Sequence, residues 1–452
     1  MKTKLLSFLF LLLLHTSGIA QPPAEILDQW SAKSPIEKAY LHFDRESYLA
    51  GETIWFKAYL YSDYQPDVIS TTLYVELLRD SVNVLSRSVL PIFLGSANGQ
   101  IELPDTLLAG NYTVRAYTAT MLNLPVAQTV TDAAFIFSRE VFIYGKNKTA
   151  AADPVISDKS ILLNFFPEGG NLVRGFTNSV AFKATDKKGL PVTVSGTIRN
   201  EKNEEVTTFN SYHDGMGLFE LLPAATTSYY AQLNGDASGK KYTLPASIEK
   251  GIALTLLPHP QGHFFELQQK KDDPAFRAAY MIGQMQHHVV FRQNFTSAKE
   301  QIQGVINTQN LYSGILQITF FNKDNMPLAE RLCFVNNKEF ILPMELSEDS
   351  IDFSVRAKNK FILHFKDTVQ GSFSVSVTDQ EYNQGTTRNE TIFTSLLLTS
   401  DIKGYVHRPA YYFSAETDSV KTATDLLMMT NGWRRFSWEQ LLQKPLPAPG
   451  YK

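Results

Sequence analysis

The stretch EKAYLHFDRESYLAGETIWFKA, residues 37–58, decides the fold. Two alternating apolar runs flank a polar segment that contains Gly51, and glycine can adopt the positive φ that a tight turn requires. In the second run Ile54 and Phe56 share one face of the expected strand, and Trp55 lies on the other. Because one face must be buried, a one-residue slip in register would be costly. The stretch therefore predicts a strand, a turn and a second strand.

The same alternation returns along the chain in short runs separated by turn residues. These runs are residues 73–78, 110–117, 179–184, 314–321 and 372–377. Short strands at this spacing, without alternating helical segments, predict antiparallel sandwiches or barrels rather than a parallel sheet. We therefore expect an all-β fold.

Polar, strand-poor segments set the expected domain boundaries. We expect β-sandwiches over residues 36–147, 155–255 and 256–345. A partial β-domain is expected over 346–415, followed by a helical segment and a linker over 416–452.

One clear helical pattern lies near the C-terminus. Thr417 or Asp418 can cap it, and apolar residues recur at helical spacing from Val420. Gly432 is the expected stop, since glycine tolerates the left-handed conformation that ends helices. A second short helix is expected to start at Ser437.

Composition excludes several classes of protein. The 452 residues are 44% hydrophobic, which excludes a disordered chain. With 42 Lys+Arg against 45 Asp+Glu, the net charge is −3, which argues against a nucleic-acid binder. Cys333 is the single cysteine, so intramolecular disulfides, cysteine-rich zinc sites and iron–sulfur clusters are excluded.

The N-terminus has the pattern of a secretory signal. A basic start, Met1–Lys4, precedes the apolar run Leu5–Leu14 and small residues at the −3 and −1 positions before Gln21. The apolar run is about ten residues, whereas a helix needs about twenty to span a bilayer. We expect a signal peptide over 1–20, no transmembrane segment after its removal, and export to the periplasm, outer membrane or cell surface.

Two segments resemble a known domain. Residues 37–58 resemble the opening of an MG2 domain, the macroglobulin-type β-sandwich of the alpha-2-macroglobulin superfamily, and 107–117 resemble a later hairpin of the same domain. The resemblance implies serial macroglobulin-like sandwiches of immunoglobulin or fibronectin type, with a short helical C-terminal segment.

Four further motifs resemble large secreted proteins of Bacteroidetes-type bacteria that carry this domain. They are FFPEGG at 165–170, DGMGLF at 214–219, PLAERL at 327–332 and LLMMTNGWRRF at 426–436. Longer proteins of this kind often continue into a TonB-receptor-plug-like domain. The resemblance therefore implies a role beside a TonB-dependent outer-membrane receptor.

The sequence offers little chemistry. Thioester-forming macroglobulins use a Cys-Gly-Glu-Gln-like run, but Phe334 follows Cys333, which we interpret as a small buried hydrophobe. His259 and His263 have a metal-pair spacing that needs a helix, and Pro260 disfavours one. His287 and His288 lie in a β-like stretch, where neighbours face opposite sides. We expect no catalytic residue, cofactor or metal.

The charged residues beside the first turn allow two interpretations. Asp44, Arg45 and Glu52 could bind a partner, or they could cap the turn and form a surface ion pair. The second interpretation is favoured, because charges that flank tight turns commonly serve local hydrogen bonds.

A dense aromatic and basic group near the C-terminus is the candidate partner-binding site. It comprises Trp433, Arg434, Arg435 and Trp438, residue types enriched at interface hot spots. The alternative is that aromatic side chains here fill cores between sandwiches.

These observations favour a non-enzymatic cell-envelope binding or scaffold protein, whose partner is an outer-membrane receptor or a peptidase. The first alternative is an endopeptidase inhibitor of alpha-2-macroglobulin type that lacks the thioester. A carbohydrate-active enzyme is less favoured, because it needs two carboxylates held about 5–10 Å apart across a cleft.

Overall fold

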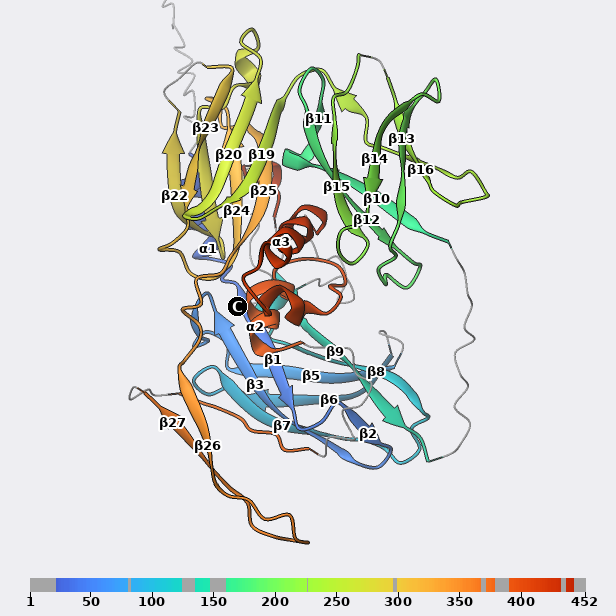
Figure 1. Cartoon of the computed structure of the whole chain (residues 1–452). Coiled ribbons are helices and arrows are strands. Elements are labelled where there is room, and N and C mark those ends of the chain that lie inside the picture. The colour runs from blue at the N-terminus through green and yellow to red at the C-terminus, as the bar shows by residue number, and fades with distance from the viewer. Residues whose placement is uncertain are drawn as a thin grey trace, which may run out of the picture.

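The chain folds into three antiparallel β-sandwiches joined by short helices, which confirms the all-β prediction (Figure 1). The computed structural model describes residues 22–79, 83–123, 135–146, 160–225, 227–295, 299–366, 371–378, 390–431 and 436–442. The predicted signal peptide and the expected linker at the end of the chain lie outside these residues. No described helix is both long and apolar enough to cross a membrane.

The first sandwich spans residues 37–144 and contains the stretch that opens the sequence analysis. One sheet is formed by β1 (Glu37–Phe43), β3 (Thr53–Ser62), β4 (Gln65–Pro66) and β7 (Ser96–Glu102). The other is formed by β2 (Ser47–Leu49), β9 (Phe137–Tyr144), β8 (Gly110–Tyr117), β5 (Thr72–Arg79) and β6 (Asn83–Pro91). Ile54 and Phe56 lie in the core between the sheets while Trp55 is exposed, as the alternation predicts.

The second sandwich spans residues 162–248. Its first sheet contains β10 (Leu162–Pro167), β12 (Asn178–Thr185) and β15 (Met216–Leu221). Its second contains β14 (Glu205–Asn210), β13 (Ser195–Asn200), β16 (Tyr229–Leu233) and β17 (Lys241–Thr243), and β11 (Leu172–Val173) pairs with β18 (Ser247–Ile248). Phe182, Phe209 and Phe219 meet in its core.

The third sandwich spans residues 252–335. One sheet contains β19 (Ile252–His259), β20 (Gly262–Gln269) and β23 (Gln301–Asn307). The other contains β22 (His288–Asn294), β21 (Tyr280–Met285), β24 (Gly314–Phe321) and β25 (Pro327–Val335). Every residue of β24 is buried, because one face lies in the sandwich core and the other is covered by helical segments.

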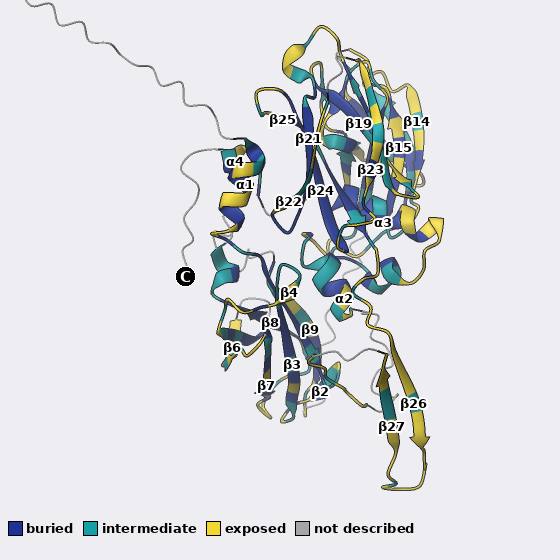
Figure 2. Cartoon of the chain, turned by 90° about the vertical axis from the view of Figure 1, so that its left-hand side faces the viewer, coloured by how far each residue is buried: buried dark blue, intermediate teal, exposed yellow. Residues whose placement is uncertain are grey.

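After the third sandwich the chain forms a separate hairpin of β26 (Met344–Ser350) and β27 (Lys360–Phe365). It extends away from the sandwiches, and its surface is largely exposed (Figure 2). The predicted strand at 372–377 is wrong, because residues 371–378 belong to no strand and pair with no other strand.

The described chain also contains several short helical segments. They are α1 (Pro23–Ser31), α2 (Ile392–Thr394), α3 (Asp418–Thr430) and α4 (Trp438–Leu442), with η1 (Thr120–Asn123), η3 (Glu168–Gly170), η4 (Pro274–Phe276), η6 (Ser395–Thr399) and η7 (Pro409–Phe413). Thr417 caps α3 by accepting a hydrogen bond from Val420 N, as predicted. Sequence analysis did not predict α1, which packs with α4 on the outer face of the third sandwich through Ile26, Leu27 and Trp30.

Candidate functional site

The most distinctive site is the junction where residues 390–431, here called the junction segment, lie between the three sandwiches (Figure 1). Its apolar side chains form one cluster with residues of the second and third sandwiches. The cluster contains Ala181, Met216, Ile315, Leu332, Leu398, Ile402, Val406, Tyr412, Ala423, Leu426, Leu427, Met428 and Met429. The junction segment therefore acts as a shared core between domains.

A buried ion cluster stands at the centre of this junction. Residue Arg331 on β25 is 2% exposed, and its Nε donates to Glu168 Oε1 at 3.1 Å. Its Nη2 donates to Asp425 Oδ1 on α3 at 2.7 Å. The cluster thus joins the second sandwich, the third sandwich and the junction segment. A buried charge is tolerated only when paired in this way.

The backbone around Glu168 is shaped for this contact. Gly169 has φ 78, a left-handed value that favours glycine. A Cβ at Gly169 would lie 3.2 Å from the Cβ atoms of Ala329 and Leu254 in the third sandwich. Glu168 also accepts a hydrogen bond from Leu256 N at 2.9 Å. The glycine therefore lets the turn approach the third sandwich closely enough for the carboxylate to reach Arg331.

The electrostatics of the cluster follow from two carboxylates sharing one cation. Burial raises the pKa of Glu168, and the negative charge of Asp425 adds to the rise, while Arg331 opposes it. Burial lowers the pKa of Arg331, but Asp425 and Glu168 more than offset this and hold it above its usual range. Arg331 therefore stays charged.

A second buried ion pair ties the first sandwich to the junction segment. Lys38 Nζ on β1 is 2.5 Å from Asp401 Oδ2, and the two side chains are 4% and 9% exposed. Lys38 Nζ also donates to Leu396 O at 2.7 Å. Gln286 Nε2, from the third sandwich, donates to the same Asp401 oxygen at 3.0 Å. Asp401 therefore connects two sandwiches through one carboxylate.

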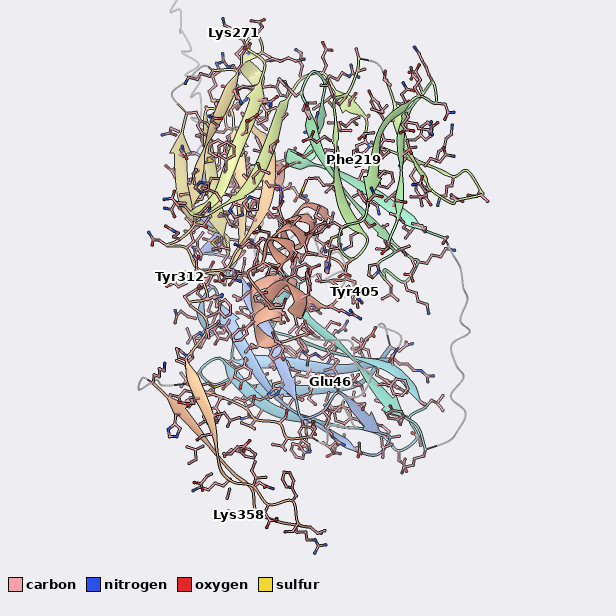
Figure 3. The ribbon with its side chains drawn as sticks, in the orientation of Figure 1. Glu46, Phe219, Lys271, Tyr312, Lys358 and Tyr405 are labelled. Atoms are coloured by element: carbon pink, nitrogen blue, oxygen red, sulfur yellow. The ribbon has the colours of Figure 1, made fainter. Side chains whose placement is uncertain are left out.

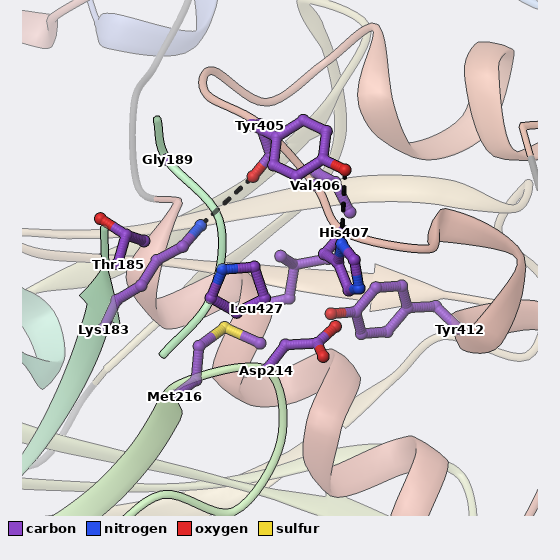
Figure 4. Close-up of a pocket in the computed structure, with 11 residues that line it drawn as sticks. Lys183, Thr185, Gly189, Asp214, Met216, Tyr405, Val406, His407, Tyr412 and Leu427 are labelled. Carbon is purple, nitrogen blue, oxygen red and sulfur yellow. Dashed lines mark hydrogen bonds between the residues drawn. The ribbon is translucent and has the colours of Figure 1, made fainter. Parts of the chain in front are cut away.

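A third contact holds the second sandwich. Lys183 Nζ on β12 donates to Asn431 Oδ1 at 2.9 Å and to Tyr405 O at 3.4 Å, and burial lowers its pKa. The pocket beside it, drawn in Figure 4, has a volume of ≈ 10 Å³, and Asp214 also lines it. That volume holds about one water, so this pocket does not suit an organic ligand.

One half-buried histidine, His263, lies near the ion cluster. The pKa of His263 on β20 is lowered to about 4, chiefly by desolvation; the charge of Asp425 opposes this and that of Arg331 adds to it. The imidazole is therefore neutral at neutral pH. No group of three or more His, Cys, Asp or Glu among the described residues could hold a metal ion.

The junction brings together residues of the motifs at 165–170, 214–219 and 327–332 and the described part, residues 426–431, of the fourth. They supply Glu168, Met216 and Arg331, and Thr430 Oγ1 donates to Met216 Sδ at 3.1 Å. Sequence analysis did not predict this convergence. One signal in the sequence could have indicated a buried ion pair: Arg331 lies within an apolar strand pattern, and a charge on a buried face requires a partner.

The candidate partner-binding residues are only partly placed. Trp433, Arg434 and Arg435 lie outside the described residues. Trp438 is 3% exposed, packs on Phe321, and donates from Nε1 to Thr319 Oγ1 at 2.9 Å. The Trp438 side chain therefore packs in the chain's own core, in agreement with the alternative interpretation that aromatic side chains in this segment fill cores.

The charged residues of the first turn serve local structure. Asp44 Oδ1 accepts hydrogen bonds from Trp55 N at 3.0 Å and Tyr48 Oη at 2.8 Å. Arg45 pairs with Asp44 and with Glu52, both at 3.3 Å. These contacts confirm the turn-cap interpretation.

The other candidates for chemistry occupy structural positions. Cys333 is buried in β25, as predicted. His259 and His263 lie on the paired strands β19 and β20 rather than on a helix. The β-like assignment of His287 is wrong, because it lies in a turn with φ 64, where its ring centroid is 4.3 Å from that of Trp30 in a tilted arrangement.

Comparisons with known proteins give fold-level likenesses alone. No protein-family model matches the chain, and no curated protein matches it. A Salmonella alpha-2-macroglobulin structure is 10% identical over 70% of this chain and 24% of that chain, with a TM-score of 0.20. An Escherichia coli alpha-2-macroglobulin structure is 9% identical over 69% of this chain and 32% of that chain, with a TM-score of 0.22. A Yersinia pseudotuberculosis adhesin structure is 12% identical over 50% of this chain and 66% of that chain, with a TM-score of 0.17. The chain thus spans a quarter to a third of those macroglobulins, and likenesses at this level assign no activity.

Proposed function

We propose that this chain is an exported, non-enzymatic cell-envelope protein that binds partners and acts as a scaffold of macroglobulin-like sandwiches. The observation that carries the proposal is the junction, where Arg331 and Asp401 each join separate domains through buried contacts. Such contacts fix the relative positions of the sandwiches. A fixed set of sandwich faces and loops suits the presentation of binding surfaces.

The first sandwich offers a described surface for a partner. Its loop patch comprises Val68, Ile69, Phe93 and Leu94, which are 79%, 49%, 76% and 69% exposed. The two loops lie side by side, since Ile92 N donates to Thr71 O at 2.9 Å. Exposed apolar patches of this kind commonly mark interaction sites.

The finer assignment rests on the sequence resemblance. Residues 37–58 form β1, the short strand β2 and the start of β3 within one sandwich, which supports an MG2 domain. We propose on that basis a Bacteroidetes-type protein that acts beside a TonB-dependent outer-membrane receptor. Trp433, Arg434 and Arg435 remain the proposed C-terminal contact.

Site-specific cross-linking in cells tests this proposal. A photo-reactive amino acid replaces Phe93 in the loop patch, and a matched control replaces Tyr212, which is 54% exposed on the second sandwich. We expect Phe93 to capture an outer-membrane receptor and the control to capture none.

The inhibitor alternative predicts a different result from the same experiment. Recovery of peptidases at Phe93 would favour a non-covalent endopeptidase inhibitor, since the buried Cys333 gives a thioester no support. A Phe93 position that captures no specific partner would contradict both functions.

A further inference from the structure

The sequence contains three Asn-Gly pairs, at residues 98–99, 234–235 and 431–432. Asparagine is a thermolabile residue, and in such a pair the backbone nitrogen of the next residue can attack its side-chain Cγ. Glycine favours this attack, because it has no Cβ to crowd the nitrogen and leaves the backbone free to rotate. Each pair is therefore a candidate site of deamidation, and its surroundings in the fold decide whether the reaction occurs.

The pair Asn234-Gly235 lies in the loop that joins β16 to β17 in the second sandwich. The core of this sandwich contains Phe219, which Figure 3 labels, together with Leu233 and Tyr242 on either side of the loop. Residues 234–240 do not belong to that core, and both Asn234 and Gly235 are exposed. Water therefore reaches the Asn234 amide, as the hydrolysis that completes deamidation requires.

The attacking group of this pair is free. Gly235 N donates no hydrogen bond to any described residue. Gly235 has φ 75, and a Cβ built on it would meet no atom within 4 Å. The backbone can therefore turn here without a collision and bring the Gly235 nitrogen to Asn234 Cγ.

Two contacts with Ser195 hold Asn234. Asn234 N donates to Ser195 O at 2.9 Å, and Asn234 Nδ2 donates to Ser195 Oγ at 3.1 Å. Neither contact occupies the Gly235 nitrogen, and the second is an exposed hydrogen bond that water can replace. Ser195 therefore restrains the side chain without blocking the attack.

The pair Asn98-Gly99 is protected by its sheet. It lies within β7, where Gly99 pairs with Phe56 on β3. A Cβ at Gly99 would lie 2.5 Å from Leu90 Cδ1, so side chains pack closely against this backbone. A paired strand holds its backbone extended, with successive side chains on opposite faces. The Gly99 nitrogen therefore cannot turn toward the Asn98 side chain without breaking the ladder.

The third asparagine is protected by burial and by its own hydrogen bonds. Asn431 is 5% exposed. Its Oδ1 accepts from Lys183 Nζ at 2.9 Å, and its Nδ2 donates to Lys403 O at 3.1 Å. Both ends of this amide are thus held, and little water reaches it. The following residue, Gly432, lies outside the described residues.

We propose that the folded chain deamidates at Asn234 and that the other two Asn-Gly pairs stay intact. The Gly235 nitrogen forms a bond to Asn234 Cγ, the Cγ–Nδ2 bond breaks, and the Gly235 N–H proton leaves with the side-chain nitrogen as ammonia. Water then opens the resulting succinimide at either carbonyl, which gives aspartate or isoaspartate at position 234. The inference concerns covalent modification and does not rest on the proposed binding function.

The fold should tolerate the product. β17 is the edge strand of its sheet and pairs with β16 alone, so an isoaspartate, which adds a methylene to the backbone before β17, disturbs one short pairing. Either product adds a negative charge two residues before Asp236. The modified chain should therefore remain folded and become more acidic, which isoelectric focusing detects.

Peptide mass spectrometry of the full chain during incubation at mildly alkaline pH tests the proposal, because the attacking nitrogen must lose its proton. We expect modification at Asn234 first, as a mixture of aspartate and isoaspartate. Asn234→Gln should abolish it, since the longer side chain closes a ring far more slowly, and the matched control Asn98→Gln should leave it unchanged. Ser195→Ala should speed it by no more than about tenfold, the most that one exposed hydrogen bond contributes.

The chain unfolded in guanidinium chloride gives the reference. There the three pairs lose their structural differences, so all three should be modified. In the folded chain, modification at Asn98 or Asn431 as fast as at Asn234 would overturn the proposal. An Asn234 that stays intact in the folded chain, while the unfolded chain is modified at that position, would overturn it as well. Circular dichroism of each variant shows that the sandwiches remain folded.

Discussion

The junction and the β26–β27 hairpin are opposites. At the junction, charged side chains that normally face water are buried, and Arg331 is 2% exposed. In the hairpin, apolar side chains that normally avoid water are exposed, and Phe353 at its outer loop is 96% exposed. The junction satisfies its charges within the chain, through Glu168 and Asp425. The apolar side chains of the hairpin, by contrast, remain exposed among the described residues.

The comparison teaches that buried charge marks a contact between domains of this chain. The junction contacts form when the chain folds and fix the arrangement of the sandwiches, so changes there should lower the free energy of unfolding. Changes at the exposed side chains of the hairpin should leave that free energy nearly unchanged.

Loss of the central cation should give the largest effect. Arg331→Ala leaves the buried Glu168 and the partly exposed Asp425 without their partner. Removing one member of a buried pair costs about 3–5 kcal/mol of the free energy of unfolding. Urea denaturation measures this. The control Arg199→Ala breaks an ion pair with Glu205, which is 58% exposed, and should cost about 1 kcal/mol or less. Equal losses in the two variants would remove the distinction between junction and surface.

The second largest effect is expected from acid, which should lower the free energy of unfolding. The pKa of His263 is lowered to about 4 by burial, so the imidazole is neutral in the folded chain but takes up a proton in the unfolded chain below about 6.5. Stability should therefore fall as pH drops from about 6.5 to about 4, by about 3 kcal/mol from this group. His263→Gln removes that contribution. Denaturation curves of wild type and variant that keep a constant difference over this pH range would contradict the assignment.

The hairpin should give the smallest effect on folding. Phe353→Ser removes a large aromatic side chain that is 96% exposed. Surface substitutions usually change the free energy of unfolding by no more than about 0.5 kcal/mol. Thermal melts of the wild-type chain and the variant measure the change. A loss comparable to that of Arg331→Ala would mean that the hairpin belongs to the folded core.

Much of the fold could be predicted from local pattern. The alternating run at 110–117 coincides with β8, and the run at 314–321 coincides with β24. The helix α3 begins beside its predicted cap at Thr417. Helix α1 could not be predicted in this way, because its nine residues gain stability from packing on the third sandwich, a contact that local sequence does not reveal.

The ion pairs of the junction form between residues far apart in the sequence, and sequence analysis did not predict them. Glu168 and Arg331 are 163 positions apart, and Lys38 and Asp401 are 363 apart. No local periodicity links such pairs. Trp438 is of a residue type that is common at interfaces, but it is buried because it packs on Phe321 and donates to Thr319, more than a hundred positions earlier in the sequence.

The central claim is that the junction segment joins the three sandwiches into one unit, and scanning calorimetry tests it most directly. Asp401 contacts Lys38 in the first sandwich and Gln286 in the third. We predict one cooperative transition for the wild-type chain, and for Asp401→Asn a separate transition of the first sandwich at lower temperature. Independent transitions in the wild type, unmoved by Asp401→Asn, would contradict the claim.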